Sequence, residues 1–207
     1  MGGCPPDAYA ATGQLWGNPL DRWDVLREDG YRWWIERLRR TFALFDLVRV
    51  DHFRGFAAYW AIPAGDDVAL NGKWEQGPGR EVFDAALGVL GPLPVLAEDL
   101  GDIDQPVIDL RKALGFPGMA VLQFGFEPAY EYNTHDLANL EPDQVVYTGT
   151  HDNDTVVGWW AELPEHRREL VRAAWRERGV SADGDHEPGW AMIELAQQTP
   201  CALAMAQ

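Results

Sequence analysis

Three carboxylates, each at the end of a predicted strand, are the side chains of this sequence best suited to do chemistry. Asp51 closes a strand expected at residues 46–51, Glu98 follows one at 94–97, and Asp152 follows one at 144–149. Retaining glycoside chemistry needs one ionised carboxylate as nucleophile. It also needs one protonated carboxyl, about 5–5.5 Å away, that serves as acid and then as base. Carboxylates at strand ends are therefore candidates for this reaction.

Asp51 has a cation on its own strand. Arg49 lies two residues earlier, and alternate residues of a strand point to the same face. A nearby guanidinium favours the charged form of a carboxylate, which is the form that a nucleophile needs. A structural salt bridge at the end of a strand is the alternative interpretation of this pair.

Glu98 and Asp152 have different predicted environments. Glu98 follows an apolar run and precedes Asp99, so burial and like charge should both raise its pKa, which suits a general acid. Asp152 has His151 beside it as a hydrogen-bonding partner. We expect Asp152 to hold sugar hydroxyls and the positive charge that develops at the reacting carbon.

Metal binding is the competing chemistry. The tripeptide at 152–154, Asp-Asn-Asp, is typical of short metal-binding motifs, and the acids at 98, 99, 102 and 104 resemble a calcium loop in composition. The ligand spacing and central glycine of an EF-hand are absent from the second segment. Acidic tripeptides like the first are common in acidic proteins. We expect no metal and no cofactor.

Composition limits the partners. The 207 residues include 17 Lys and Arg against 33 Asp and Glu, a net charge of -16. Such a surface repels nucleic acid phosphates and anionic lipid, so we expect neither nucleic acid nor membrane partners. Ten tryptophans, six tyrosines and eight phenylalanines suit either an aromatic core or stacking on sugars.

The cysteines and the lengths of the apolar segments give information on the cellular location of the protein. Cys4 and Cys201 have no CxxC spacing and offer no disulfide framework. No apolar run approaches transmembrane length. A cytoplasmic location is expected, whereas the oligomeric state cannot be read from the sequence.

Hydrophobic periodicity predicts alternating helices and strands. Helices are expected at 31–45, 80–90, 104–114, 164–178 and at the start of 188–206, and strands near 47, 94, 120 and 145. Asp104 should cap its helix and Gly115 should end it. Leu170, Val171 and Trp175 should form a buried stripe. This order is typical of a parallel α/β sheet. The strand near 47 should be buried, since Phe45, Leu47, Val48 and Val50 are apolar.

Two segments read as loops. Residues 1–23 are punctuated by glycine and proline and yet carry aromatic residues, so we expect an ordered loop packed over the site. Residues 57–79 are rich in glycine and proline and read as a long inserted loop, of the kind that usually forms a lid or a binding loop.

Seven short blocks, in order, together resemble the 4-α-glucanotransferases of glycoside hydrolase family 77, also called amylomaltases or disproportionating enzymes. Each block alone is moderately specific, and their common order makes the resemblance very specific. The blocks are PPD (5–7), ATGQLWGNPL (11–20), RVDHFRGF (49–56), NGKWEQGPG (71–79), AEDLG (97–101), GFPGMAVLQF (115–124) and YTGTHDNDT (147–155).

The resemblance implies roles for the acids and their neighbours. Asp51 would be the nucleophile with Arg49 as its partner, Glu98 the acid and base, and Asp152 with His151 the stabiliser of the transition state. The implied partners are α-1,4-glucans and maltooligosaccharides. Implied substrate-binding residues are Tyr9, Gln14, Trp16, Asn18, His52 and Asp99.

The sequence departs from the family pattern in two respects. Where the family often has two bulky aromatics after Pro-Pro-Asp, this chain has Ala8 and Tyr9, which should reduce aromatic contact there. A full (β/α)8 barrel takes about 250 residues, so residues 1–207 are expected to be one partial TIM-barrel domain. It would cover the middle strands, be incomplete at both ends, and have little activity alone.

Two other functions fit parts of the same pattern. A non-catalytic α-glucan-binding module would explain the aromatic content, although it has no need of three carboxylates with both helper residues. A hydrolase of the related α-amylase family shares the order of the acids. The blocks around Trp16 and Trp74 disfavour that family.

Overall fold

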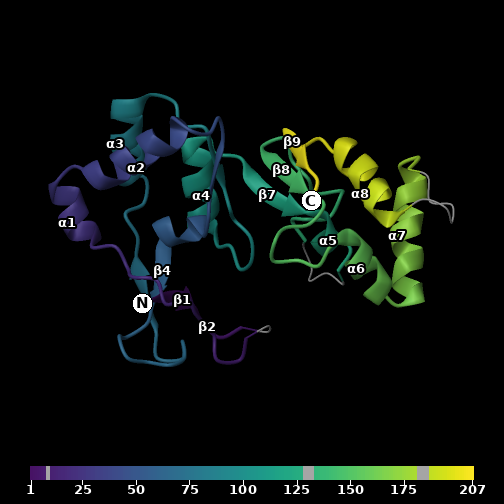
Figure 1. The fold of residues 1–207 in the computed structure, drawn as a ribbon, viewed down its shortest axis with the longest axis horizontal. Helices are drawn as coiled ribbons and strands as arrows, with labels where there is room; N and C mark the ends of the chain where they lie inside the picture. Colours follow the sequence, from purple (N-terminus) through teal and green to yellow (C-terminus); the bar gives the residue numbers. More distant parts are fainter. Residues whose placement is uncertain (8–9, 128–132, 181–186) are drawn as a thin grey trace. The chain divides into compact units, whose positions relative to one another are not determined.

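The computed structural model of residues 1–207 describes the whole chain except residues 8–9, 128–132 and 181–186 (Figure 1). It divides into two compact units, Met1–Phe116 and Pro117–Gln207. Each unit is described by itself. Within the described residues, no helix is long and apolar enough to cross a membrane.

A pair of parallel strands is the centre of the first unit. Strand β3 (Val48–Val50) pairs with β6 (Val95–Ala97), in the register Val48 to Val95 and Val50 to Ala97. The helices of this unit are α1 (Trp23–Glu28), α2 (Arg32–Phe42), α3 (Glu81–Leu90) and α4 (Gln105–Leu114), and a 3-10 turn, η1, spans Phe53–Phe56. The predicted helices and strands of this region are confirmed, and the structure adds α1 and η1.

A second sheet of the first unit corrects the loop predictions for 57–79 and 1–23. Strands β4 (Ala58–Ala61) and β5 (Lys73–Gln76) form an antiparallel hairpin. Strand β1 (Gly2–Cys4) pairs with β4 and with β2 (Gln14–Leu15), which gives the order β2-β1-β4-β5. The pairing escaped prediction because these strands have two to four residues each, too few for an alternating pattern to be recognised.

An aromatic pair holds the hairpin together. Trp60 lies directly opposite Trp74, and their rings meet edge to face with centroids 5.4 Å apart. Cross-strand aromatic pairs of this kind stabilise two-stranded segments. Gly72 lies beside the pair, and a Cβ at that position would come within 2.1 Å of the Trp60 indole nitrogen. Only glycine fits this close approach.

The second unit is built on three parallel strands. Strands β7 (Gly118–Val121), β8 (Gln144–Tyr147) and β9 (Leu203–Met205) lie in that order. The helices of this unit are α5 (Leu122–Gly125), α6 (Val156–Glu162), α7 (Glu165–Glu177) and α8 (Pro188–Gln197). The strands predicted near 120 and 145 are confirmed as parallel neighbours. Strand β9 is the element that follows the last predicted helix.

Three residues predicted to be buried are exposed instead. Leu170 is 64% exposed, because it lies a third of a turn away from the buried pair Val171 and Trp175 on α7. Phe45 is 59% exposed because α2 ends at Phe42, so Phe45 no longer lies on its buried face. Leu47 is also exposed, since β3 pairs only with β6 among the described strands and its other edge is open.

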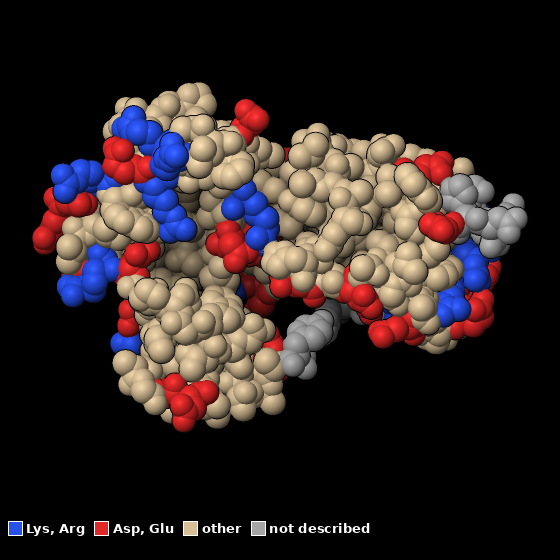
Figure 2. Space-filling view, in the orientation of Figure 1, with Lys and Arg blue, Asp and Glu red and all other residues tan. Residues whose placement is uncertain are grey.

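Charged side chains of both signs are interspersed on the surface. Figure 2 shows Lys and Arg side chains lying beside Asp and Glu side chains. Examples are Arg80 with Asp84 at 2.8 Å and Arg176 with Glu169 at 2.8 Å. Positive charge is thus offset locally at these positions.

Helix α4 has the caps that its sequence predicts. The Asp104 side chain accepts a hydrogen bond from the Val107 N–H, and Gly115 ends the helix in the left-handed region at φ 68°. Both features satisfy backbone groups that a helix leaves unpaired at its ends.

We expect Asp104→Ala to lower the free energy of unfolding by about 1 kcal/mol, because it removes the capping oxygen. Asp104→Asn is the matched control, since asparagine caps as well as aspartate. Urea unfolding followed by circular dichroism measures both variants. Equal losses in the two variants would show that the charge of Asp104, which faces Arg54 at 3.7 Å, matters rather than its capping oxygen.

Candidate active site

The register of the parallel strand pair brings Asp51 and Glu98 together. Val50 is opposite Ala97, so the two acids are the next residues on neighbouring strands. The Glu98 N–H donates to the Val50 carbonyl at 2.9 Å, which continues the ladder to the acids themselves. Adjacent strands lie about 4.7–4.9 Å apart. Two of the three predicted catalytic acids therefore share one end of this strand pair.

Asp51 is exposed and has one close cation. Its Oδ1 lies 2.6 Å from Nη1 of Arg49, and its side chain is 72% exposed, whereas that of Arg49 is largely buried. Exposed ion pairs contribute little to stability, so this pair does little for the fold. The pair places the exposed Asp51 carboxylate beside the Arg49 guanidinium. This contact was predicted from the alternation of Arg49 and Asp51 along the strand.

Glu98 is more enclosed and is held by the backbone. Its Oε2 accepts from the His52 N–H at 2.7 Å, and its Oε1 accepts from the Leu100 N–H at 2.9 Å. Burial raises the pKa of Glu98 and the negative charge of Asp51 raises it further, while the two backbone hydrogen bonds and Arg49 oppose the rise. The predicted upward direction is confirmed, with burial as its main cause. The like charge is that of Asp51 and not, as predicted, that of Asp99, which is paired with Arg111.

His52 makes the turn that follows Asp51 and leads into η1. Its backbone lies in the left-handed region at φ 47° and ψ 51°, an uncommon conformation outside glycine. Burial, aided by the positive charge of Arg54, lowers the pKa of His52 to about 4. The imidazole is therefore neutral near pH 7. It is a hydrogen-bonding group rather than a second cation beside Asp51.

The amino-terminal segment lies against this end of β3. The Trp16 ring meets the His52 ring edge to face, with centroids 4.7 Å apart. The Trp16 indole N–H donates to Oε1 of Gln14 at 3.0 Å. Asn18 lines a small hollow of about 180 Å³ together with Asp51 and His52. The structure thus brings Trp16, Asn18 and His52 to Asp51, while Tyr9 lies outside the described residues.

Asp99 contacts the protein rather than the hollow. Its Oδ2 lies 3.1 Å from Nε of Arg111 on α4, and both side chains are largely buried. Arg111 Nη1 also donates to the Phe116 carbonyl at 3.0 Å. Asp99 therefore ties the loop after β6 to α4. A role for it in sugar binding stays a prediction.

Asp152 and His151 belong to the second unit, where they follow β8. His151 Nε2 lies 3.4 Å from Asp152 Oδ2, and both side chains are exposed. The turn is fixed by Asn153, whose Oδ1 accepts from the Thr150 N–H and hydroxyl, each at 2.9 Å. The two side chains lie close to each other, and the expected hydrogen bond between them stays a prediction. That these two residues meet Asp51 and Glu98 stays a prediction.

Arg54 is a residue whose role the sequence did not reveal. Its guanidinium lies over the Trp74 ring at 4.4 Å, donates to the Asp102 carbonyl and faces Asp104 at 3.7 Å. It links η1, the hairpin and the loop that leads from Glu98 to α4. The only sequence feature that could have indicated this role is the position of Arg54 inside the RVDHFRGF block. Its contacts depend on the hairpin, which was not predicted.

Among the described residues, no group of three or more His, Cys, Asp or Glu side chains is arranged to hold a metal ion. Two residues of the predicted acidic tripeptide have local partners instead. Asn153 bonds to Thr150, and Asp154 Oδ1 accepts from the Thr155 N–H at 2.7 Å.

Comparisons with known proteins agree with one another. A family model described as 4-alpha-glucanotransferase, Glyco_hydro_77, matches residues 1–207. The 4-alpha-glucanotransferase of Streptococcus pneumoniae serotype 4 is 53% identical over 173 residues, which cover 83% of this chain and 34% of that protein. The 4-alpha-glucanotransferase of Thermus thermophilus is 43% identical over 212 residues, with 99% and 41% covered.

A solved structure agrees with these matches. Amylomaltase from Streptococcus agalactiae in complex with acarbose superposes with a TM-score of 0.91 at 32% identity, over 100% of this chain and 41% of that one. The chain therefore spans between a third and a half of the length of these proteins.

The environment of Glu98 leads to a testable titration. Because the charge of Asp51 raises the pKa of Glu98, Asp51→Asn should lower that pKa. Because the charge of Arg49 lowers it, Arg49→Gln should raise it. A ¹³C NMR titration of the Glu98 side chain measures both shifts. Asp109→Asn, an exposed change on α4, is the control and should leave the pKa where it was. An unchanged Glu98 pKa in Asp51→Asn would show that the two carboxyls are not coupled.

Proposed function

The chain belongs to the 4-alpha-glucanotransferases of glycoside hydrolase family 77, and on that premise we propose that it carries the catalytic centre of a retaining transglycosylase. The enzyme would move segments of α-1,4-glucan to the 4-hydroxyl of an acceptor glucan or of glucose. The observation that supports this most directly is the Val50 to Ala97 register, after which Asp51 and Glu98 follow on adjacent strands.

In the first step, the Asp51 carboxylate attacks the anomeric carbon of the donor sugar. The bond from that carbon to the glycosidic oxygen breaks, and Glu98 gives its proton to the leaving oxygen. The raised pKa of Glu98 keeps a larger share of it protonated at neutral pH. The product is a glucosyl ester on Asp51 and a shortened glucan with a free 4-hydroxyl.

In the second step, the roles reverse. The Glu98 carboxylate takes the proton from the 4-hydroxyl of an acceptor, whose oxygen attacks the anomeric carbon and releases Asp51. Asp152 and His151 would stabilise the positive charge that develops on the sugar in both steps. Water as acceptor would give hydrolysis, so transfer depends on how well the acceptor is held and water excluded.

The arrangement of the parallel strands supports a proposal about the fold. We interpret the parallel strands β3, β6, β7, β8 and β9, with their intervening helices, as the middle part of a (β/α)8 barrel. The carboxyl ends of such strands are where active sites of this fold gather. The likeness to amylomaltase from Streptococcus agalactiae supports the interpretation. Trp16 and the amino-terminal segment would then cover the glucan cleft.

The catalytic roles can be tested in a chimera. Residues 1–207 would replace the matching segment of the Thermus thermophilus 4-alpha-glucanotransferase, with which the chain aligns over 99% of its length. We expect the chimera to release glucose and longer maltodextrins from maltotriose. Asp51→Ala should reduce this to background, because no nucleophile remains, while maltooligosaccharide binding persists.

Two further variants complete that test. Glu98→Gln should cost about 10²–10⁴-fold in turnover, as for loss of a general acid. Asp46→Ala, an exposed change on the amino side of β3, should leave turnover unaltered. Normal turnover in the Asp51→Ala chimera would remove Asp51 from its proposed role. Free reducing ends in excess of transfer products would favour a hydrolase.

We expect the 207-residue chain alone to have weak activity or none, because it spans only 34% and 41% of the length of the Streptococcus pneumoniae and Thermus thermophilus proteins. Incubation with maltotriose, followed by chromatography of glucose and longer maltodextrins, measures it. Turnover comparable with that of the chimera would contradict this expectation. Sugar binding without turnover in both proteins would favour a non-catalytic glucan-binding module.

A further inference from the structure

The loop that carries Glu98 connects β6 to α4 and is held at its start by backbone contacts. The Phe53 N–H donates to the Glu98 carbonyl at 3.0 Å, and the Leu100 N–H donates back to Oε1 of Glu98 at 2.9 Å. Gly101 then turns the chain in the left-handed region at φ 88°. The direction of the Glu98 carboxyl therefore depends on the position of Leu100, and so on what holds the rest of the loop.

Arg54, in η1, contacts the later part of this loop. Its guanidinium donates to the Asp102 carbonyl and lies 3.7 Å from Oδ2 of Asp104, the residue that caps α4. The Arg54 side chain is only 12% exposed, and hydrogen bonds from a charged donor are stronger than neutral ones. The ion pair of Asp99 with α4 anchors the loop before Leu100, and Arg54 anchors it after Leu100.

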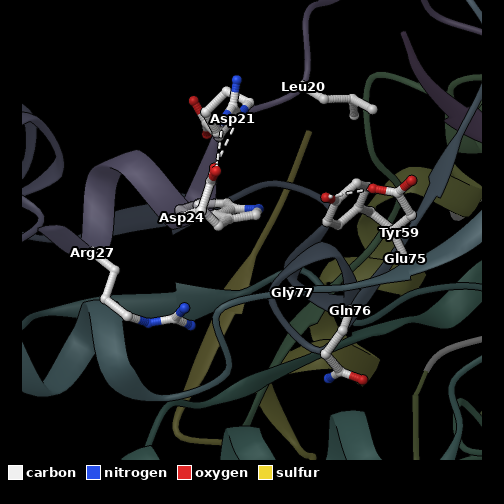
Figure 3. A pocket seen from close by; sticks show the side chains of 10 residues that line it. Leu20, Asp21, Asp24, Arg27, Tyr59, Glu75, Gln76 and Gly77 are labelled. Atoms are coloured by element: carbon white, nitrogen blue, oxygen red, sulfur yellow. Dashed lines mark hydrogen bonds and ion pairs between the residues drawn. The ribbon is translucent and has the colours of Figure 1, made fainter.

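The β4–β5 hairpin holds Arg54 from another side. The centre of the Trp74 ring lies 4.4 Å from the guanidinium carbon, a distance at which a cation is attracted to an aromatic face. The hairpin is tied to the end of η1, because Gln76 Nε2 and the Gly77 N–H both donate to the Ala57 carbonyl, at 2.7 Å and 2.9 Å. Figure 3 shows Gln76 and Gly77 where the hairpin borders a hollow of about 500 Å³. The hairpin thus keeps the guanidinium against the loop.

The arrangement calls for an arginine and not only for a positive charge. A guanidinium is planar, stacks on aromatic rings and donates through five N–H groups, whereas the ammonium of lysine is a compact point charge. Stacking on Trp74 while donating to Asp102 needs the planar group. A lysine at position 54 would keep the charge but would hold the loop less firmly.

We propose that Arg54 is a positioning residue for Glu98: by holding the loop at Asp102, it keeps the Leu100 N–H on the Glu98 carboxyl and fixes the direction in which that carboxyl points. The inference rests on the proposed function, in which Glu98 is the acid and base. Arg54 acts through the loop and does not itself contact the reacting atoms. A misplacement of about 1 Å in a catalytic group can cost about 10²-fold in rate.

NMR spectroscopy of the 207-residue chain tests the positioning without any turnover. An amide proton that donates to a carboxyl group changes its chemical shift as that group titrates, because the hydrogen bond strengthens when the acceptor becomes charged. In the unaltered chain, the amide protons of His52 and Leu100 should both follow the titration of Glu98. In Arg54→Lys, the Leu100 amide should lose more than about half of this shift, whereas the His52 amide should keep it.

Arg37→Lys is the matched control for the NMR titration. Arg37 also lies over a tryptophan ring, that of Trp34 at 5.2 Å, but on α2 and away from the Glu98 loop. Both amide shifts should stay as they are in this variant. Urea unfolding checks that each variant is folded. A Leu100 amide that titrates with its full shift in Arg54→Lys would overturn the proposed role of Arg54.

Turnover in the chimera gives a second, independent measurement. Arg54→Lys should lower kcat about 10–10²-fold and leave KM within about threefold. Combined with Glu98→Gln, it should cost no more than about twofold beyond Glu98→Gln alone, because the position of the acid no longer matters once the acid is lost. Arg37→Lys should leave turnover unaltered.

The outcomes separate this inference from the proposed function. Full and additive loss in the double variant, or a rise in KM with unaltered kcat, would show that Arg54 does not act through Glu98. Normal turnover in Glu98→Gln would contradict the proposed function instead. The amide titration would still report whether Arg54 holds Leu100 on Glu98, so either one can fail alone.

Discussion

The register between β3 and β6 is the constraint on which the site depends. A slip of one residue would turn every side chain of a strand to its other face and would separate Asp51 from Glu98. The register is held on the core side by Val95 and Ala97, which are fully packed. It is held at its end by the Glu98 N–H on the Val50 carbonyl and the Phe53 N–H on the Glu98 carbonyl. The positions of Asp51 and Glu98 are therefore determined by backbone hydrogen bonds and core packing, and not by the electrostatic interaction between the two acids.

Two carboxyls at the same end of a strand pair have opposite environments. Asp51 is exposed beside a guanidinium, whereas Glu98 is enclosed and accepts two backbone N–H groups. Burial raises the pKa of Glu98, and under the proposed mechanism this favours the protonated form that a general acid needs. The turn at His52 produces the difference, because its left-handed backbone directs one N–H to Glu98 while the chain continues past Asp51.

The helices and strands that were predicted correctly from the sequence are those marked by local features, such as capping residues and apolar runs. Helix α4 was predicted with both ends, because a capping aspartate and a terminal glycine have direct backbone consequences. The strands carrying Asp51 and Glu98 were predicted from apolar runs. The β4–β5 hairpin was missed because its strands have only four residues each. The exposure of Leu47 could not be foreseen, since its burial depends on which strand lies alongside β3. Phe45 is exposed because α2 ends three residues earlier than expected.

The contact between Gly72 and Trp60 links two positions that lie twelve residues apart. The Trp60 indole donates to the Ala69 carbonyl at 2.9 Å, so the ring cannot simply swing aside. Any side chain at position 72 would meet it. Among homologous chains, a residue larger than glycine at position 72 should therefore occur together with a smaller ring or an aliphatic residue at position 60. The two sites are expected to change as a pair over evolution.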